Sequence, residues 1–112
     1  MSSWREQDAL TQASCRDRNE SVVRGSELSR SEGSLHAFMC ECGDAGCTET
    51  ARLTVAEYES VRAYPTRFLI VTNHENPEVE WVVSERTRFS VVETLAGIAS
   101  KVALRTNPRL AY

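Results

Sequence analysis

Lysine is almost absent from this chain of 112 residues: Lys101 is the single lysine, and the other twelve of the 13 basic residues are arginines. The arginines form no continuous basic run. Aspartate and glutamate together number 16, so the formal net charge is −3. Binding to DNA or RNA depends largely on basic side chains that neutralise phosphates. The charge balance therefore argues against direct nucleic-acid binding.

Long apolar runs are also missing, and stretches such as Phe68–Val71 span only a few residues. A helix that crosses a bilayer needs about 20 consecutive, mostly apolar residues. The first ten residues, MSSWREQDAL, lack the apolar segment of a signal peptide. We therefore expect no membrane association and a cytoplasmic location.

The motifs of several common enzyme classes are missing too. The chain has no glycine-rich phosphate loop and no G-x-S-x-G nucleophile motif. It also lacks the H-x-E and P-C-x-x-C pair of the zinc deaminases. We therefore expect that the protein is not an enzyme.

The residue pattern divides the chain into three parts. The first, residues 1–34, combines a polar helix over 4–24 with a linker over 25–34 that is rich in Ser, Gly and Glu. The core follows over 35–104, and 105–112 form a flexible tail. The helix carries one narrow, mostly apolar stripe, which is formed by Cys15, Asn19, Val22 and Val23. So narrow a stripe buries little surface, so the helix must dock on the core or on a partner.

The core pattern predicts a small α+β domain with a short antiparallel sheet and a central helix. A capping box, Thr54-x-x-Glu57, opens that helix, which runs to about Ala63 and turns Val55, Tyr58 and Val61 inward. We expect strands over 35–40, 51–54, 68–72 and 89–93, the last two antiparallel, and a helix over 95–104 with Leu95, Ile98, Ala99 and Val102 inward. Residues 77–85 favour a short helix, although they also alternate in part like a strand.

Three of the four cysteines, Cys40, Cys42 and Cys47, fall within eight positions, and glycines flank the turn between the last two. Clustered cysteines in the cytoplasm are more often metal ligands or redox groups than structural disulfides. Zinc prefers four thiolate or imidazole ligands in a tetrahedron. We predict a structural Cys3His zinc site with His74 as the fourth ligand and His36 as its rival. Zinc would then stabilise the core.

Other readings of the same stretch stay open. Cys40 and Cys42 can form a strained disulfide, or Cys47 can act as a resolving thiol.

Cys15 is expected to pack on the helix stripe. The nearby acids Glu41, Asp44 and Glu49 are expected to be solvated loop residues, not general bases. Trp81 and Phe89 can mark a surface patch, although the core is the commoner place for them. Trp4 either anchors a partner or folds back on the domain.

The chain resembles a family of small, poorly characterised actinobacterial proteins over residues 15–95. The resemblance rests on F-x-C-E-C-x4-C, L-T-x-x-E-Y and a histidine followed by P-E-x-E. The matching positions are Asn19-Glu20, Phe38, Cys40-Glu41-Cys42, Cys47, Leu53-Thr54, Glu57-Tyr58, His74, Pro77-Glu78, Glu80 and Val91-Val92. One departure is Asn73, where that family has glycine before the histidine. The resemblance implies a metal site and brings no known activity.

These observations favour a zinc-stabilised protein-interaction or regulatory module, with a protein partner in a process such as transcription or translation. The alternative is a thiol switch that responds to oxidants or to zinc, since oxidation of zinc-bound thiolates ejects the metal. A metal- or thiol-dependent enzyme is the less favoured third reading.

Overall fold

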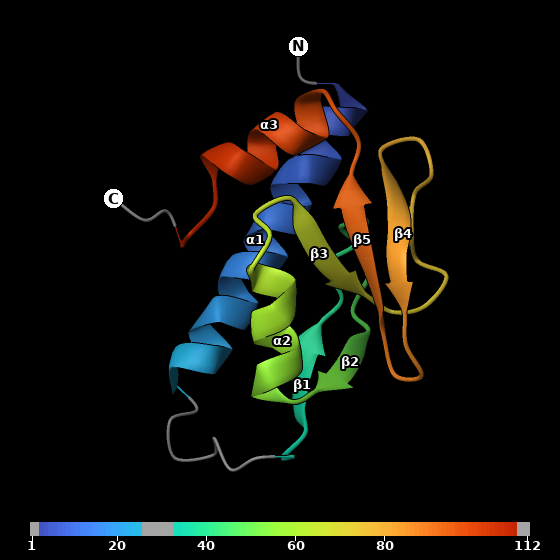
Figure 1. Cartoon of the computed structure of the whole chain (residues 1–112). Coiled ribbons are helices and arrows are strands. Elements are labelled where there is room, and N and C mark those ends of the chain that lie inside the picture. The colour runs from blue at the N-terminus through green and yellow to red at the C-terminus, as the bar shows by residue number, and fades with distance from the viewer. Residues whose placement is uncertain (1–2, 26–32, 110–112) are drawn as a thin grey trace.

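The computed structural model describes residues 3–25 and 33–109 of the chain. Within them lie three helices and five strands, which confirms the predicted α+β class (Figure 1). The elements in chain order are α1 (Trp4–Gly25), β1 (His36–Met39), β2 (Thr50–Leu53), α2 (Val55–Arg62), β3 (Arg67–Ile70), β4 (Glu80–Glu85), β5 (Ser90–Thr94) and α3 (Ile98–Arg105).

The strands form two antiparallel sheets. β1 and β2 make a hairpin, and the second sheet has the order β3-β5-β4. The predicted antiparallel pairing of 68–72 with 89–93 is confirmed, because Phe68 lies opposite Val92 and Leu69 lies opposite Val91.

Residues 77–85 were predicted as a short helix, and this is wrong because β4 occupies most of them. The turn before it is closed by the amides of Val79 and Glu80, which both donate to the carbonyl of Asn76 at 3.1 Å. From Glu80 the chain extends along β5, with an irregularity in register between Val82 and Ser84. β-branched valines suit an extended strand, and the pairing with β5 outweighs the local helical pattern.

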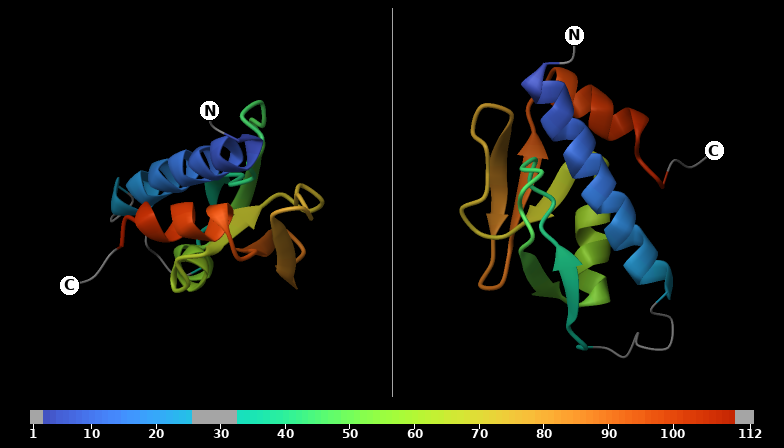
Figure 2. Two further views of the ribbon diagram at one scale, coloured as in Figure 1. Left: turned by 90° about the horizontal axis from the view of Figure 1, so that it is seen from above. Right: turned by 180° about the vertical axis from the view of Figure 1, so that it is seen from behind.

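The two faces of the three-stranded sheet pack against different elements. One face carries Phe68, Ile70 and Val92, which cluster with Ala103 of α3 and with two of the cysteines. The other face packs with α2 and with the β1–β2 hairpin. α1 and α3 lie side by side (Figure 2). The sheet is therefore the middle layer of the fold.

The central helix α2 begins as predicted. The Thr54 hydroxyl accepts a hydrogen bond from the Glu57 amide at 3.0 Å, and the Glu57 carboxylate accepts one from the Thr54 amide at 2.9 Å. The capping box is thus complete. Tyr58 and Val61 are buried as expected, and the Tyr58 ring stacks on Phe38 with centroids 4.6 Å apart.

The predicted helix over 4–24 is confirmed as α1, but its buried face differs from the predicted stripe. Of that stripe only Asn19 and Val23 are buried. Polar side chains make up much of the buried face, which consists of Ala9, Gln12, Ala13, Arg16, Asn19, Glu20 and Val23. α1 docks within the chain itself because each of these polar groups finds a partner there.

Arg16 shows how the polar face is held. Its guanidinium donates to the carbonyls of Pro65 at 2.9 Å and Ala103 at 3.0 Å, and it lies over the Phe68 ring. Burial lowers the pKa of this guanidinium to about 10. At neutral pH the group is still charged, and it ties α1 to both α3 and the turn before β3.

The C-terminal helix is shorter than predicted, because α3 begins at Ile98, after Gly97 with φ 124°. Ala99 and Val102 are buried as expected, whereas Leu95 and Ile98 are exposed, contrary to the prediction.

The predicted tail and linker are described only in part. In the tail, Arg105 ends α3, and the Arg109 guanidinium donates to the Glu20 carboxylate at 2.6 Å. The described part of the tail is therefore tied to α1. Most of the linker over 25–34 and residues 110–112 lie outside the described residues. The three-part division of the chain stays a prediction.

No helix in the described ranges has both the length and the apolar composition needed to cross a bilayer.

We predict that Arg16→Met lowers the free energy of unfolding by about 2–4 kcal/mol, because buried carbonyls lose their donor. Urea denaturation measures the effect. Arg18→Met, at an exposed position on the same helix, is the matched control and should stay within about 0.5 kcal/mol of the original chain. An Arg16→Met variant as stable as the original would show that the desolvation cost of the charge cancels its hydrogen bonds.

Candidate metal centre

The three clustered cysteines lie in the loop between β1 and β2, which we call the knuckle (residues 40–49). The Cys40 amide donates to the Glu49 carbonyl at 3.0 Å, and this hydrogen bond closes the base of the knuckle. At its tip the Cys47 amide donates to the Asp44 carbonyl, and the Asp44 carboxylate accepts from the Gly46 amide at 2.9 Å. These bonds fold the loop back, so that its three thiols converge.

Gly43 lets the knuckle approach α1. A Cβ atom at this position would lie 2.8 Å from the Cβ of Asp8, which is closer than real contacts allow. Glycine is therefore required by the close packing of the loop against the helix.

The fourth member of the group, His74, follows β3 in a tight turn. Its amide donates to the Val71 carbonyl at 3.0 Å, and the preceding Asn73 takes φ 77°. Asparagine tolerates this left-handed conformation better than most residues other than glycine. The asparagine before the histidine thus supports the turn, although the resembled pattern has glycine there.

The structure brings the four predicted ligands together. The Nδ1 atom of His74 lies 3.5 Å from the Cys40 Sγ and 3.7 Å from the Cys47 Sγ. Together with Cys42, their ligand atoms all lie within 4.8 Å of one another. The group joins the β1–β2 hairpin to the end of β3.

These distances fit a tetrahedral ion. With Zn–S near 2.3 Å and Zn–N near 2.05 Å, a tetrahedron places nitrogen about 3.6 Å from sulfur and two sulfurs about 3.8 Å apart. The two distances from the His74 Nδ1 atom to sulfur, 3.5 and 3.7 Å, are close to this value. Cys40, Cys42 and Cys47 are all free thiols in the structure, and no Cys40–Cys42 disulfide forms. The donor set and its spacing can therefore hold a metal ion.

The orientation of His74 also suits a ligand. Its Nε2 atom lies 3.1 Å from a carboxylate oxygen of Glu49. Donation of the Nε2 hydrogen to that carboxylate leaves the Nδ1 lone pair directed at the thiols, which is the usual arrangement around metal-bound histidine. The rival, His36, lies on β1 opposite Leu53 and is not part of the group found among the described residues.

The thiols differ in burial. Cys40 and Cys42 are buried, whereas Cys47 and His74 are half-buried. Burial raises the pKa of the Cys40 and Cys42 thiols, while the Val71 amide donates to the Cys40 sulfur at 3.1 Å. A cation at the centre would reverse the effect of burial and favour the thiolates.

Glu41, between two of the cysteines, is fully buried, so the expectation of a solvated loop residue is wrong for it. One carboxylate oxygen accepts from the Asn19 amide group at 2.8 Å and from the Tyr58 hydroxyl at 3.0 Å. The other accepts from the backbone amide of Leu69 at 3.0 Å. Burial raises the pKa of Glu41, and these donors oppose the shift. Asp44 and Glu49 are exposed, as expected.

Asn19 extends the same network. Its side chain donates to the carbonyl of Met39 at 2.9 Å and accepts from the Met39 amide at 2.8 Å. It therefore pairs with β1 much as a neighbouring strand would. One signal of this role is visible in the sequence: an asparagine within an otherwise apolar helical stripe.

The fourth cysteine, Cys15, is half-buried on α1 and lies outside the group. It lines a hollow of about 370 Å³ together with Met39 and Cys47. Cys47, one of the four candidate ligands, thus borders a hollow on the surface.

No family model, no curated protein and no solved structure matches the chain. The case for the site therefore depends on its own geometry.

We predict that Glu41→Gln lowers the free energy of unfolding by about 1–3 kcal/mol although the side chain keeps its shape. All three partners of the carboxylate are donors, so the new amide group must face at least one of them. Thermal and urea unfolding at fixed metal content measure the effect. Glu85→Gln, at an exposed position of β4, is the control and should change little. Equal stability of the two variants would contradict the prediction.

Proposed function

We propose that the protein binds one zinc ion through Cys40, Cys42, Cys47 and His74, and that the ion is structural. The observation that carries the proposal is the approach of the four ligand atoms to within 4.8 Å of one another. Three thiolates and one imidazole suit zinc better than magnesium or calcium, which prefer oxygen ligands.

The number of ligands supports a structural role. A catalytic zinc keeps one position open for water or substrate, whereas four protein ligands fill the tetrahedron. The acids nearest the ligands do not suggest a base: Glu41 is enclosed by its three donors, and Glu49 is paired with His74. We therefore propose that the protein is not an enzyme.

Zinc at this place would fasten elements that are distant in the sequence. The knuckle joins β1 to β2, and His74 follows β3. The same knuckle carries Glu41, whose hydrogen bonds reach α1 and α2. Metal binding energy would thus become folding energy, as in other small zinc domains.

For the biological role we propose a cytoplasmic protein-interaction or regulatory module that acts on a protein partner, in a process such as transcription or translation. Trp4 and Trp81 support it, since large aromatic side chains that stay exposed are frequent anchors of protein interfaces. The acidic net charge, −3, disfavours nucleic acid as the direct partner.

The first test is the metal content of the purified, untagged protein, with a thiol titration alongside. We expect about one zinc per chain and three protected thiols, because three of the four ligands are cysteines. Native mass spectrometry gives the stoichiometry. A metal-free protein with reactive Cys40 and Cys42 would contradict the proposal.

Ligand variants extend the same test. Cys42→Ser should lose zinc and melt at a much lower temperature, and His74→Ala should weaken zinc binding by more than the roughly 10- to 100-fold typical of an outer-shell partner. Cys15→Ser and His36→Ala are the matched controls, because both residues lie outside the group. Loss of zinc in His36→Ala with none in His74→Ala would overturn the ligand assignment.

A thiol switch is the second candidate, and the half-buried Cys47 favours it. This ligand borders a hollow through which a small oxidant can reach its sulfur. Two-electron oxidation of the Cys47 thiolate and a neighbouring thiolate by hydrogen peroxide would form a disulfide, take up two protons from solvent, yield two waters and release the metal.

We predict that, if the site is a switch, mild peroxide releases zinc within minutes and a thiol reductant restores binding. A colorimetric zinc chelator follows the release, and partner binding is compared before and after. Zinc that stays bound under peroxide would contradict the switch and leave only the structural role.

A further inference from the structure

One face of the three-stranded sheet is only half covered. α2 packs over the β3 side of this face, where Leu69 is buried. On the β4 side, Trp81 lies opposite Glu93 and so shares the face, yet 53% of Trp81 is exposed. The face is therefore open beyond α2.

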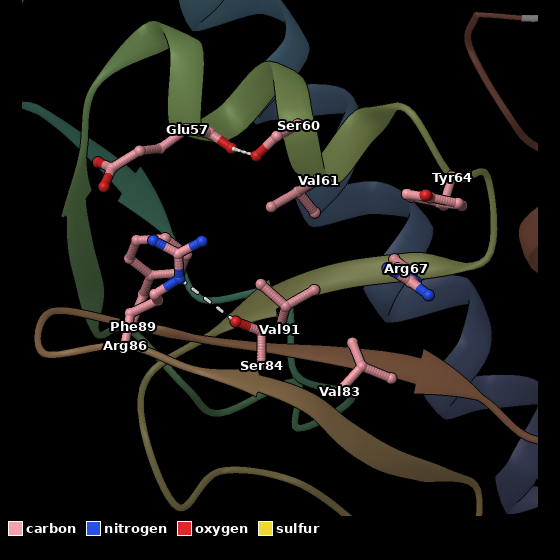
Figure 3. Close-up of a pocket in the computed structure, with 10 residues that line it drawn as sticks. All are labelled: Glu57, Ser60, Val61, Tyr64, Arg67, Val83, Ser84, Arg86, Phe89 and Val91. Atoms are coloured by element: carbon pink, nitrogen blue, oxygen red, sulfur yellow. Dashed lines mark hydrogen bonds between the residues drawn. The ribbon is translucent and has the colours of Figure 1, made fainter.

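A groove of about 230 Å³ follows the boundary between α2 and the uncovered strands (Figure 3). Its apolar lining comes from Val61 of α2, from Val83 of β4, and from Phe89 and Val91 at β5. An engineered cavity of about 150 Å³ holds a benzene ring. The groove thus has room for one large apolar side chain.

The rim of the groove has an unbalanced positive charge. Glu57 pairs with Arg88 at 2.8 Å, and Glu93 pairs with Arg67 at 2.9 Å. Arg86 is exposed; its Nε donates to the Ser84 hydroxyl at 3.3 Å, and no carboxylate partner is found for it among the described residues. A carboxylate on a bound molecule can therefore pair with Arg86 without displacing an existing ion pair.

Aromatic and arginine side chains flank the same groove. Tyr64 is 50% exposed, and the guanidinium of Arg67 lies 3.9 Å from the centre of its ring. Tyrosine, tryptophan and arginine are the side chains most enriched at the centres of protein interfaces. Trp81, in the same row of the sheet as Arg67, adds a third such side chain.

We propose that this groove docks a peptide segment of a protein partner in which a large apolar residue stands next to an acidic one. The apolar side chain fills the space above Val61, Phe89 and Val91, and the carboxylate pairs with Arg86. The inference deepens the proposed interaction role and does not depend on the metal.

Capped dipeptides isolate this chemistry. The full-length protein, with its methyl groups and backbone labelled, is titrated in NMR experiments with N-acetyl-phenylalanyl-glutamate amide. We expect the methyl signals of Val61, Val83 and Val91 and the indole signal of Trp81 to shift, with a dissociation constant in the millimolar range. The lysine analogue should bind about two- to fivefold more weakly, as expected for one exposed ion pair. The alanyl-glutamate analogue should not bind.

Arg86→Gln should abolish the preference for glutamate over lysine, while Arg105→Gln, at an exposed position of α3, should preserve it. The proposal is overturned if the groove signals do not move, or if the glutamate and lysine probes bind equally. It is also overturned if phenylacetate binds and the dipeptides do not, which would indicate a pocket for a small carboxylate.

Light scattering over a range of protein concentrations tests a second copy of the chain as the occupant. A dimer that shifts the same signals would replace the peptide partner and overturn the proposal. Zinc is measured on the same samples. A metal-free protein that binds the probe would refute the zinc site alone, and a zinc-loaded protein that does not bind would refute the groove alone.

Discussion

The fold depends on the buried carboxylate of Glu41. It lies where α1, α2 and β3 meet, and it accepts a hydrogen bond from each, through Asn19, Tyr58 and the Leu69 amide. An isolated charge in such a place would be very costly, whereas a carboxylate surrounded by donors is tolerated. Moving any one of the three elements away would take a donor from the carboxylate, so the contact favours this arrangement. The apolar packing of α1, such as that of Val23 in the core, acts together with this polar contact.

Glu41 and the metal centre depend on each other through one short piece of backbone. Cys40 and Cys42 flank Glu41 in the sequence. Their sulfurs lie beside His74, while the carboxylate lies beside Asn19 and Tyr58. An ion bound to the sulfurs would fix the backbone on which the carboxylate is held. Conversely, the Glu41 hydrogen bonds hold the backbone between the two cysteines, whose sulfurs lie within 4.8 Å of each other.

The sequence was most informative where a local rule applies. The capping box of Thr54 and Glu57 predicted the start of α2, and the spacing of the cysteines with His74 predicted which side chains would meet. It was least informative where long-range partners decide. Nothing near Glu41 in the sequence shows that Asn19, 22 positions earlier, will donate to it. β4 likewise becomes a strand only because β5 lies beside it.

The candidate metal centre and the groove lie on opposite faces of one sheet, and β5 contributes to both. Val92 packs in the cluster that contains Cys40 and Cys42, while its neighbour Val91 lines the groove. Two hydrogen bonds join Leu69 of β3 to Glu41 of the knuckle. The Glu41 amide donates to the Leu69 carbonyl, and the Leu69 amide donates to the Glu41 carboxylate. Loss of order in the knuckle would therefore loosen β3 and, through the β3–β5 pairing, the strand that lines the groove. Through Glu41 and the β3–β5 pairing, the knuckle is thus connected to the sheet that carries the groove.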